Sequence, residues 1–483
     1  MQIYPLKKIV CVLSDRRDIE LIKVEKRDNT NVIIYKNPTD EYKIQKGDIY
    51  MKSVWSDSVR LPRFKTLEED LKTDILVIGG GMAGLLCAYF LKQAGVNYVL
   101  VEANRIGSGI TKNTTAKITS QHGLIYDKLI KNAGVEKAKM YLEANELALQ
   151  KYRQLCTNIS CGFEEKDAYV YTLNNREKID KELRAVEKLG FIAEFQENIP
   201  LPFEINGAIK FKGQAQFNPL QFIHAICSGL NIYENTFVKK VENNTAKTDK
   251  GNITAKKIIV ATHFPFINTH GSYYLKLYQH RSYAIALQNA PDVKGMYVDE
   301  AEKGMSFRNY DNRLLIGGGD HRTGKKGGAW QELRSFAKKY YPHSVEKYYW
   351  ATQDCMSLDG VPYIGHYSKN THDMYVASGF NKWGMTSSMV AAMILSDMVV
   401  GKRNDFAQVF SPHRSIMKPQ LLVNAFTATL NLLTPTLKRC PHMGCALKWN
   451  PIEHTWDCPC HGSRFDKNGK LIDNPSKKSI ENS

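Results

Sequence analysis

Residues 74–84 read Asp-Ile-Leu-Val-Ile-Gly-Gly-Gly-Met-Ala-Gly, and this stretch decides the fold. The β-branched, apolar run 74–78 predicts a buried parallel strand, and residues 84–93 predict the helix that follows it. The glycines between them match the pattern G-x-G-x-x-G. A strand, a glycine-rich turn and a helix in this order predict a Rossmann-type dinucleotide-binding unit in an α/β fold.

Each glycine of the pattern has its own physical role. Gly79 permits the tight turn, Gly81 lets the backbone approach a pyrophosphate, and Gly84 lets helix and strand pack closely. The helix N-terminus offers unpaired N–H groups to the phosphates. Glu102 ends the next expected strand, 96–102, at the distance where an acidic residue binds the ribose hydroxyls.

Further elements follow along the chain. Residues 134–156, 389–400 and 421–433 predict helices, and the stretch 160–330 alternates short strands such as 167–172 and 207–212 with turns. The first fifty residues carry no chemical motif, and Met51 opens a segment that could itself be a start. We therefore expect residues 1–50 to be an extension or an artefact of start-site assignment, which an intact-mass measurement would decide.

Composition and charge set limits on the class of protein. Hydrophobic residues make up 43% and charged residues 24% of 483 residues, an ordinary globular balance for two or three domains. The net charge is +17, but there is no dense basic run and no nucleic-acid motif, so no nucleic-acid partner is expected. Neither a signal peptide nor an apolar stretch long enough to span a bilayer is visible, and we expect a cytoplasmic protein.

The ten cysteines are unevenly distributed, and this points to a metal centre. Cys440-Pro-His442 and Cys458-Pro-Cys-His461 form a C-x-H and C-x-x-H pair. Two thiolates on one iron and two imidazoles on the other define a Rieske [2Fe–2S] centre. The alternative is a zinc site built from some of the same residues.

Several ordered segments add a resemblance to known enzymes. They are residues 105–117, Phe217-Asn-Pro-Leu-Gln-Phe222, 257–262, Ser357-Leu-Asp-Gly-Val-Pro-Tyr-Ile-Gly365 and 377–386. With them the chain from about residue 71 to 400 resembles the D-amino-acid-oxidase and glycine-oxidase superfamily. The resemblance implies a Rossmann-like FAD-binding domain with an antiparallel-sheet substrate domain. It also implies FAD contacts at Gly79, Gly81, Ala83, Gly84, Glu102, Ser108, Gly109, Thr111, Thr115, Ala116, Lys117, Val238, Gly379, Gly384 and Met385.

The C-terminal segment resembles Rieske proteins of respiratory complexes and Rieske-tailed FAD oxidoreductases. That resemblance implies a small all-β module, a disulfide between Cys445 and Cys460, and a Ser463 hydrogen bond to a bridging sulfide. Phe465 stands where high-potential members have tyrosine, which predicts a lower potential. Little room precedes Cys440, so we expect a minimal module that leans on the FAD domain. The expected division is 51–410 for the FAD-dependent oxidoreductase, 411–434 for a linker and 435–483 for the module.

The reaction follows from the two cofactors. Flavin takes two electrons from a substrate and the cluster passes them on singly, so a dehydrogenase or reductase is favoured over a simple oxidase. Amino-acid oxidases of the superfamily bind the substrate carboxylate with an arginine three residues before the first C-terminal signature, where this chain has Asp354. A cationic substrate, possibly an amine, suits an acid there.

Asp354 and His321 are the candidate catalytic residues, and His122, His263, His280 and Arg281 are weaker ones. The expected partners are a small-molecule substrate and an electron donor or acceptor of unknown identity. Two alternatives stay open from the sequence. The chain could be an electron-transfer flavoprotein without an organic substrate, or a flavoenzyme with a structural zinc tail.

Overall fold

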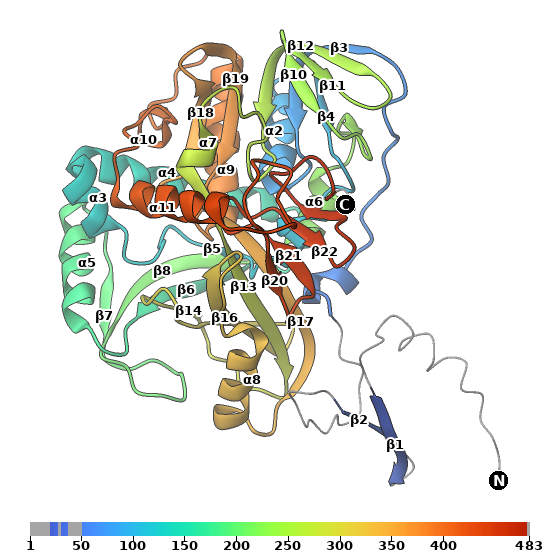
Figure 1. Ribbon diagram of the computed structural model, residues 1–483. Coiled ribbons are helices and arrows are strands. Elements are labelled where there is room, and N and C mark those ends of the chain that lie inside the picture. The colour runs from blue at the N-terminus through green and yellow to red at the C-terminus, as the bar shows by residue number, and fades with distance from the viewer. Residues whose placement is uncertain (1–19, 28–29, 37–50, 481–483) are drawn as a thin grey trace.

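The computed structural model describes residues 20–27, 30–36 and 51–480 (Figure 1). In the first fifty residues it describes β1 (Glu20–Arg27) and β2 (Thr30–Lys36), which pair antiparallel as a separate two-stranded sheet. The rest of that region lies outside the described residues, so the idea that residues 1–50 are an extension stays a prediction.

The first large sheet is built around the glycine-rich stretch. Its strands β3, β4, β9, β12 and β19 run parallel, and β10, β11 and β18 add antiparallel pairs. Residues 75–78 of β3 are buried, as expected of a parallel strand covered on both faces. The strands are β3 (Leu71–Ile78), β4 (Tyr98–Val101), β9 (Ile232–Tyr233), β10 (Lys240–Glu242), β11 (Thr245–Lys247), β12 (Asn252–Val260), β18 (Tyr363–Ser368) and β19 (Thr371–Ser378).

Helices α2 (Met82–Gln93) and α9 (Gly384–Val399) pack against each other and share one core with α6 (Pro219–Ile226). Both α2 and α9 are largely apolar because they lie inside the domain. The sequence predicts a helix at 389–400, and α9 begins five residues earlier, at Gly384. The 3₁₀ turns η1 (Val54–Asp57) and η2 (Ile110–Asn113) lie beside α6.

The second sheet is antiparallel except where β14 meets β6, and this confirms the expected fold class. Its order is β17-β13-β16-β15-β14-β6-β8-β5, with β7 on β8. The strands are β5 (Lys117–Ile118), β6 (Glu164–Tyr171), β7 (Glu194–Gln196), β8 (Ala208–Gln216), β13 (Leu277–Gln288), β14 (Met296–Asp299), β15 (Ser306–Tyr310), β16 (Arg313–Arg322) and β17 (Val345–Ser357). The helices α3 (Tyr126–Ala133), α4 (Val135–Cys156), α5 (Arg176–Lys188) and α8 (Ala329–Tyr340) accompany it.

The C-terminal region forms a small four-stranded antiparallel sheet in the order β20-β21-β22-β23. These strands are β20 (Lys448–Asn450), β21 (Thr455–Asp457), β22 (Arg464–Asp466) and β23 (Leu471–Asp473). Helix α10 (Ala407–Phe410) ends just before the expected linker, 411–434, and the linker contains the whole of α11 (Pro419–Leu433). Figure 1 shows α11 crossing the front of the molecule below α7 (Tyr273–Lys276), beside the small sheet.

Candidate active site and metal centre

One cavity of about 870 Å³ runs through the molecule. It begins at the carboxyl ends of β3 and β4, where parallel sheets commonly bind ligands. It continues to the face formed by β13, β16 and β17 and ends against residues 471–474, 476 and 477 of the C-terminal module. The nucleotide loop, the second sheet and the C-terminal module therefore share one internal space.

The glycine loop at the start of the cavity has the tight geometry that the sequence predicts. A Cβ on Gly84 would lie 1.9 Å from the carbonyl oxygen of Gly79, so only glycine lets α2 approach the turn. Gly79 has φ +114°, and a Cβ there would lie 2.5 Å from the carbonyl oxygen of Ala261. Gly81, by contrast, borders the cavity and would meet only Thr111 Oγ1, at 3.4 Å. The loop thus fits a pyrophosphate beside the N-terminus of α2.

Glu102 follows β4 at the cavity wall. Its two carboxylate oxygens accept hydrogen bonds from the backbone N–H of Gly80 (2.6 Å) and of Asn104 (2.8 Å). Burial raises the pKa of this carboxyl, partly offset by those two donors. The side chain is thereby held where ribose hydroxyls can donate to it.

Thirteen of the fifteen residues proposed to contact FAD line the cavity, and Gly84 and Ala116 do not. Gly84 acts through helix packing, and the carbonyl of Ala116 accepts a hydrogen bond from Arg308 (2.9 Å) behind the wall. Lys117 does line the cavity, and burial, helped by the charge of Arg308, lowers its pKa to about 7. The cavity and its donors fit FAD, with α9 opening at Gly384 on its wall.

Asp354 lies on β17 within the cavity wall. Burial raises the pKa of its carboxyl to about 6, and the positive charge of Lys382 opposes that shift. Lys382 forms an ion pair with Asp320, and both also line the cavity. His280 stands opposite Asp354 in the β13–β17 register, so the two share one face. Glu302 also lines the cavity, with a carboxylate oxygen 3.8 Å from Nε2 of His280, so this part of the cavity combines three carboxylates, one ammonium and one imidazole.

His321, the second proposed catalytic residue, is outside the cavity lining. Its Nε2 lies 3.0 Å from the hydroxyl of Tyr283 and its Nδ1 lies 2.9 Å from the carbonyl oxygen of Arg322. Both ring nitrogens already have partners, so we withdraw His321 from the catalytic set. Its neighbour Asp320, on the same strand, does line the cavity, and no sequence pattern predicts that position.

The weaker catalytic candidates also divide into residues that line the cavity and residues that do not. His263 and His280 line the cavity, whereas His122 and Arg281 do not. His122 is buried, with its Nδ1 2.6 Å from the hydroxyl of Tyr141, and its ring stacks on Trp383 of the cavity wall. Arg281 points to the C-terminal module and is described with it below.

The four proposed cluster ligands lie on two loops of the small sheet. Cys440 and His442 precede β20, and Cys458 and His461 connect β21 to β22. The two imidazole rings are 4.9 Å apart and nearly perpendicular. Both Nδ1 atoms are buried without a hydrogen-bond partner, while Nε2 of His461 lies 3.0 Å from the carbonyl oxygen of Tyr274. With Nε2 thus engaged, Nδ1 keeps the lone pair that a metal needs.

The protonation states of His442, His461 and Cys440 also suit metal binding. Burial lowers the pKa of His442 to about 4 and that of His461 to about 3, so both rings are neutral at neutral pH. The hydrogen bond between the thiols of Cys440 and Cys458 lowers the pKa of Cys440 to about 7, while this bond and burial raise the pKa of Cys458 well above its usual value. Two neutral imidazoles and two buried sulfur atoms are the donor set of a Rieske cluster.

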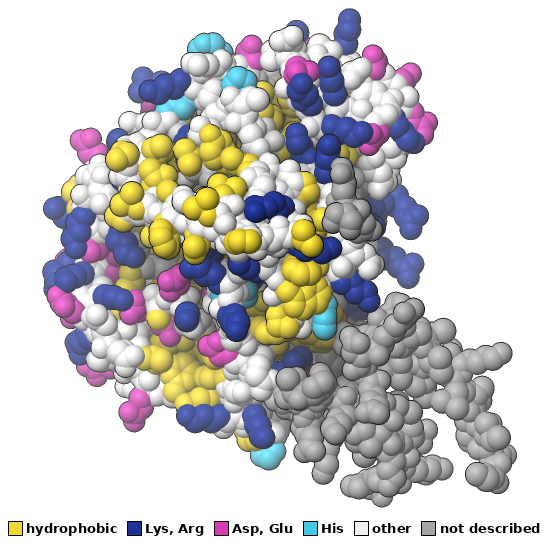
Figure 2. Space-filling model, in the orientation of Figure 1, with side chains coloured by type: hydrophobic (Ala, Val, Ile, Leu, Met, Phe, Trp, Pro, Cys, Tyr) yellow, Lys and Arg dark blue, Asp and Glu magenta, His cyan; other side chains and the backbone are white. Residues whose placement is uncertain are grey.

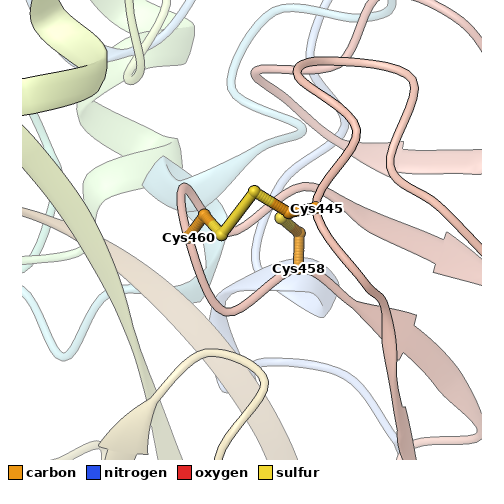
Figure 3. A group of neighbouring side chains, drawn as sticks. All are labelled: Cys445, Cys458 and Cys460. Carbon is orange, nitrogen blue, oxygen red and sulfur yellow. A yellow bond between two sulfur atoms is a disulfide. The ribbon is translucent and has the colours of Figure 1, made fainter. Parts of the chain in front are cut away.

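Cys445 and Cys460 form the disulfide that the resemblance implies, and it joins the two ligand loops. Figure 3 shows Cys458 beside this disulfide. The three sulfur atoms lie within 4.8 Å of one another, but two of them are bonded together and are not free thiolates. Cys458 is therefore the residue of this trio that can hold iron.

Phe465 packs against these cysteines and is fully buried. We expect Phe465→Tyr to raise the reduction potential of the cluster, because a phenolic hydroxyl adds one hydrogen bond to the reduced, more negative centre. One hydrogen bond of about 1 kcal/mol corresponds to roughly 40 mV for one electron. A redox titration followed by EPR measures the shift, with Phe406→Tyr, at a partly buried residue packed against the FAD-domain core, as control. An unchanged potential would place the phenyl para position away from the cluster.

The C-terminal module is fixed to the FAD domain by buried polar contacts. Glu453 of the module accepts hydrogen bonds from Arg281 Nε (3.0 Å) and from the hydroxyl of Tyr283 (2.8 Å). Arg322 donates to the carbonyl oxygens of Pro459 (3.0 Å) and Cys460 (3.3 Å). These contacts agree with a minimal module that depends on its neighbour.

A short path leads from the cavity to the ligand loops. His263 lines the cavity, and its Nε2 lies 3.2 Å from Oε1 of Gln279. Nε2 of Gln279 donates to the carbonyl oxygen of His461 at 2.8 Å. The ring of Phe264 lies 6.4 Å from that of His442 and 6.1 Å from that of His461. One glutamine thus connects a cavity residue with the backbone of a proposed cluster ligand.

Among the described residues, no helix has both the length and the apolar character needed to cross a membrane.

Comparison with known proteins gives two family matches. Residues 74–398 match the family described as FAD dependent oxidoreductase, and residues 418–483 match the Rieske [2Fe-2S] domain. The second match favours iron over the zinc alternative, and it begins at residue 418, before α11 and upstream of the expected start of the module at 435.

Individual relatives cover most of the chain. The Rieske 2Fe-2S iron-sulfur protein YhfW of Bacillus subtilis is 35% identical over 89% of this chain and 97% of its own length. Gamma-glutamylputrescine oxidoreductase of Escherichia coli is 23% identical over 76% of this chain and 92% of its own. The crystal structure of L-proline dehydrogenase from P. horikoshii superposes with a TM-score of 0.60, at 19% identity, over 71% of this chain and 98% of that one.

Proposed function

The chain belongs to the FAD-dependent oxidoreductase family and ends in a Rieske [2Fe-2S] domain, and from that premise we propose that it is a dehydrogenase for a small amine. One observation carries this proposal: residues of the Rieske module line the same cavity as the glycine loop and Asp354. When bound, FAD accepts two electrons from a substrate and the cluster accepts them singly. A cluster beside the flavin pocket is of little use to an enzyme that hands its electrons directly to oxygen.

The charges in the cavity support a cationic substrate. Asp354 occupies the position where amino-acid oxidases of the superfamily have an arginine for a carboxylate. The nearby carboxylate of Asp320 is already paired with Lys382 and that of Glu302 is exposed to solvent, so Asp354 is the buried acceptor for a substrate ammonium. A relative whose name states that it acts on gamma-glutamylputrescine, an amine, agrees with this choice.

Lys117 supplies the proton chemistry in this proposal. Oxidation of an amine to an imine removes a hydride from carbon and a proton from nitrogen. Nζ of Lys117 donates a hydrogen bond to Thr115 Oγ1 (3.2 Å), and its pKa of about 7 leaves much of it neutral at physiological pH. A neutral amine on the cavity wall can accept the proton that the substrate nitrogen loses.

We expect Asp354→Asn to lower kcat/KM for the amine roughly 10- to 100-fold, because a charged hydrogen bond is lost. Asp354 ionises near pH 6, so kcat/KM of the native enzyme should rise as the pH increases through 6. The variant should lose the part of this acidic limb that lies near pH 6 and keep only the part near pH 7, where Lys117 loses its proton. Asp373→Asn, an exposed carboxylate on β19, is the matched control. An unchanged pH profile in Asp354→Asn would contradict the assignment.

Anaerobic mixing with a panel of primary and secondary amines tests the function itself. Bleaching of the flavin band, followed by the EPR signal of a reduced Rieske cluster, is the expected result. If no amine bleaches the flavin while dithionite reduces both centres, the chain is an electron-transfer flavoprotein instead. The cytoplasmic location expected from the sequence stays a prediction.

A further inference from the structure

Helix α11 buries its polar side and exposes its apolar side, which is the reverse of an ordinary surface helix. Its buried side chains are polar: Asn424, Thr427 and Asn431. Arg322 Nη1 of the FAD domain donates to Asn424 Oδ1 at 2.9 Å, and Ala446 N donates to the carbonyl oxygen of Asn431 at 2.9 Å. The helix is therefore held on the protein by hydrogen bonds, and its apolar residues are left to face outward.

The outward face is a continuous apolar stripe. Leu422, Phe426, Leu430 and Leu433 follow one another at helical spacing, and three of them, Leu422, Phe426 and Leu433, are exposed by 74%, 71% and 76%. Nine of the sixteen exposed large hydrophobic side chains among the described residues fall between 417 and 443. Figure 2 shows hydrophobic side chains gathered over this helix. Such a concentration marks an interaction surface rather than ordinary scatter.

The charges around the stripe have a single sign. Between Asp405 and Glu453 the chain contains no acidic residue, but it contains Arg414, Lys418, Lys438, Arg439 and Lys448. Arg414 is paired with Asp359, and the other four border the two ends of α11 or the small sheet. The helix itself carries no charged side chain over its fifteen residues. An uncharged apolar stripe with a cationic border complements an anionic surface.

We propose that α11 lies in the plane of an anionic lipid bilayer, with its leucine stripe in the acyl boundary and its cationic border on the headgroups. A second copy of this chain fits less well, because a symmetric contact would bring two cationic borders together. A protein partner would favour aromatic, methionine and arginine side chains at the centre of the contact. The stripe instead has three leucines and one phenylalanine, as interfacial helices do.

This surface adjoins the metal centre. A Cβ on Gly444 would lie 4.0 Å from Leu432 Cδ2, so the loop with Cys440 and His442 packs on the end of α11. Met443 of that loop is itself exposed. Membrane contact through α11 therefore holds the first ligand loop near the headgroups. This inference concerns location and does not depend on the identity of the substrate.

Sedimentation of the full-length holoenzyme with vesicles tests the proposal. One set contains equal amounts of phosphatidylglycerol and phosphatidylcholine, and the other contains phosphatidylcholine alone. We expect strong binding to the first set, weakened by added salt, and at least tenfold weaker binding to the second. Phe426→Asp combined with Leu430→Asp should reduce the partition coefficient at least tenfold. Ile192→Asp, on an exposed residue outside the stripe, should leave it unchanged.

A second variant guards against a folding defect in the first. Lys438→Glu combined with Lys448→Glu leaves the stripe intact and should lower binding only to the anionic vesicles. Visible absorption of flavin and cluster reports that each variant is folded. Binding that survives the double aspartate substitution would overturn the proposal. A lipid-free dimer, seen by sedimentation velocity and broken by the same substitution, would overturn it in favour of a second copy.

Discussion

Replacing Cys440 by serine should remove the iron–sulfur cluster completely while the flavin stays bound. The serine side chain has nearly the same shape as the cysteine side chain. Its hydroxyl does not ionise at neutral pH, whereas one iron of a Rieske cluster needs two cysteine thiolates. Cys440 is buried beside Cys458, and the glycine loop lies in a different sheet. We therefore expect a native flavin spectrum, no EPR signal after dithionite, and iron content near zero.

This variant also separates the two halves of the proposed reaction. Anaerobic bleaching of the flavin by an amine should persist in Cys440→Ser, because Asp354 and Lys117 are unchanged. Reduction of a one-electron acceptor should fall about 100-fold or more if electrons leave through the cluster. Cys227→Ser, a buried cysteine in the core of the FAD domain, is the matched control and should behave as the native protein. A full EPR signal in Cys440→Ser would exclude this residue as a ligand.

The parts of the site that the sequence predicted are those built from residues close together in the chain. The glycine loop and Glu102 belong to one strand–helix–strand unit, so their spacing alone places them at one sheet edge. The Rieske ligands likewise come from two short loops with fixed internal spacing. In both cases a local pattern is sufficient, because the residues that bind the cofactor lie within short segments of fixed spacing.

The parts that the sequence missed depend on contacts between distant segments. Asp320 and Lys382 form an ion pair in the cavity although 62 residues separate them, and the sequence around either residue does not predict that pair. The imidazole of His321, one residue from Asp320, makes it a candidate from the sequence, but alternation along β16 turns it to the other face. Predicting whether a strand residue faces a cavity requires knowledge of the register of the neighbouring strands.

Helix α11 shows a further limit of pattern reading. Its apolar stripe predicts a helix correctly, and the usual inference would bury that stripe. The structure buries the polar side instead, because the side chain of Asn424 accepts a hydrogen bond from Arg322 of the FAD domain and the backbone carbonyl of Asn431 accepts one from Ala446 N of the first ligand loop. Which face of an amphipathic helix is buried depends on those partners, and they are invisible in the helix sequence.

Glu453→Gln is the second variant for which we expect a large effect, on the docking of the Rieske module. Glu453 is buried between Arg281 and Arg464, and each of them forms an ion pair with it. Removing the carboxylate leaves Arg281 without its acidic partner in the buried interface. Breaking a buried pair in this way costs about 3–5 kcal/mol. Thermal unfolding should start at lower temperature, and limited proteolysis should release the C-terminal module.

Glu453 also sets a lower limit to the pH range in which the module stays docked. Burial by itself would raise the pKa of Glu453, but Arg281 and Arg464 outweigh it and lower the pKa to about 2. In the unfolded chain the pKa is about 4.3, so the stabilisation is complete above that pH and declines as the pH falls towards 2. The native protein should lose module docking over this window, and Glu453→Gln should not show that loss.

The control for this experiment is Glu143→Gln on α4, which removes an exposed ion pair with Lys139. Because exposed pairs contribute little, its stability should change by less than about 1 kcal/mol. If Glu453→Gln were equally mild, the module would be held mainly by the backbone contacts of Arg322 and Gln279. Mixing a substrate with Glu453→Gln distinguishes the two cases, since only a loosened module would slow reduction of the cluster after normal bleaching of the flavin.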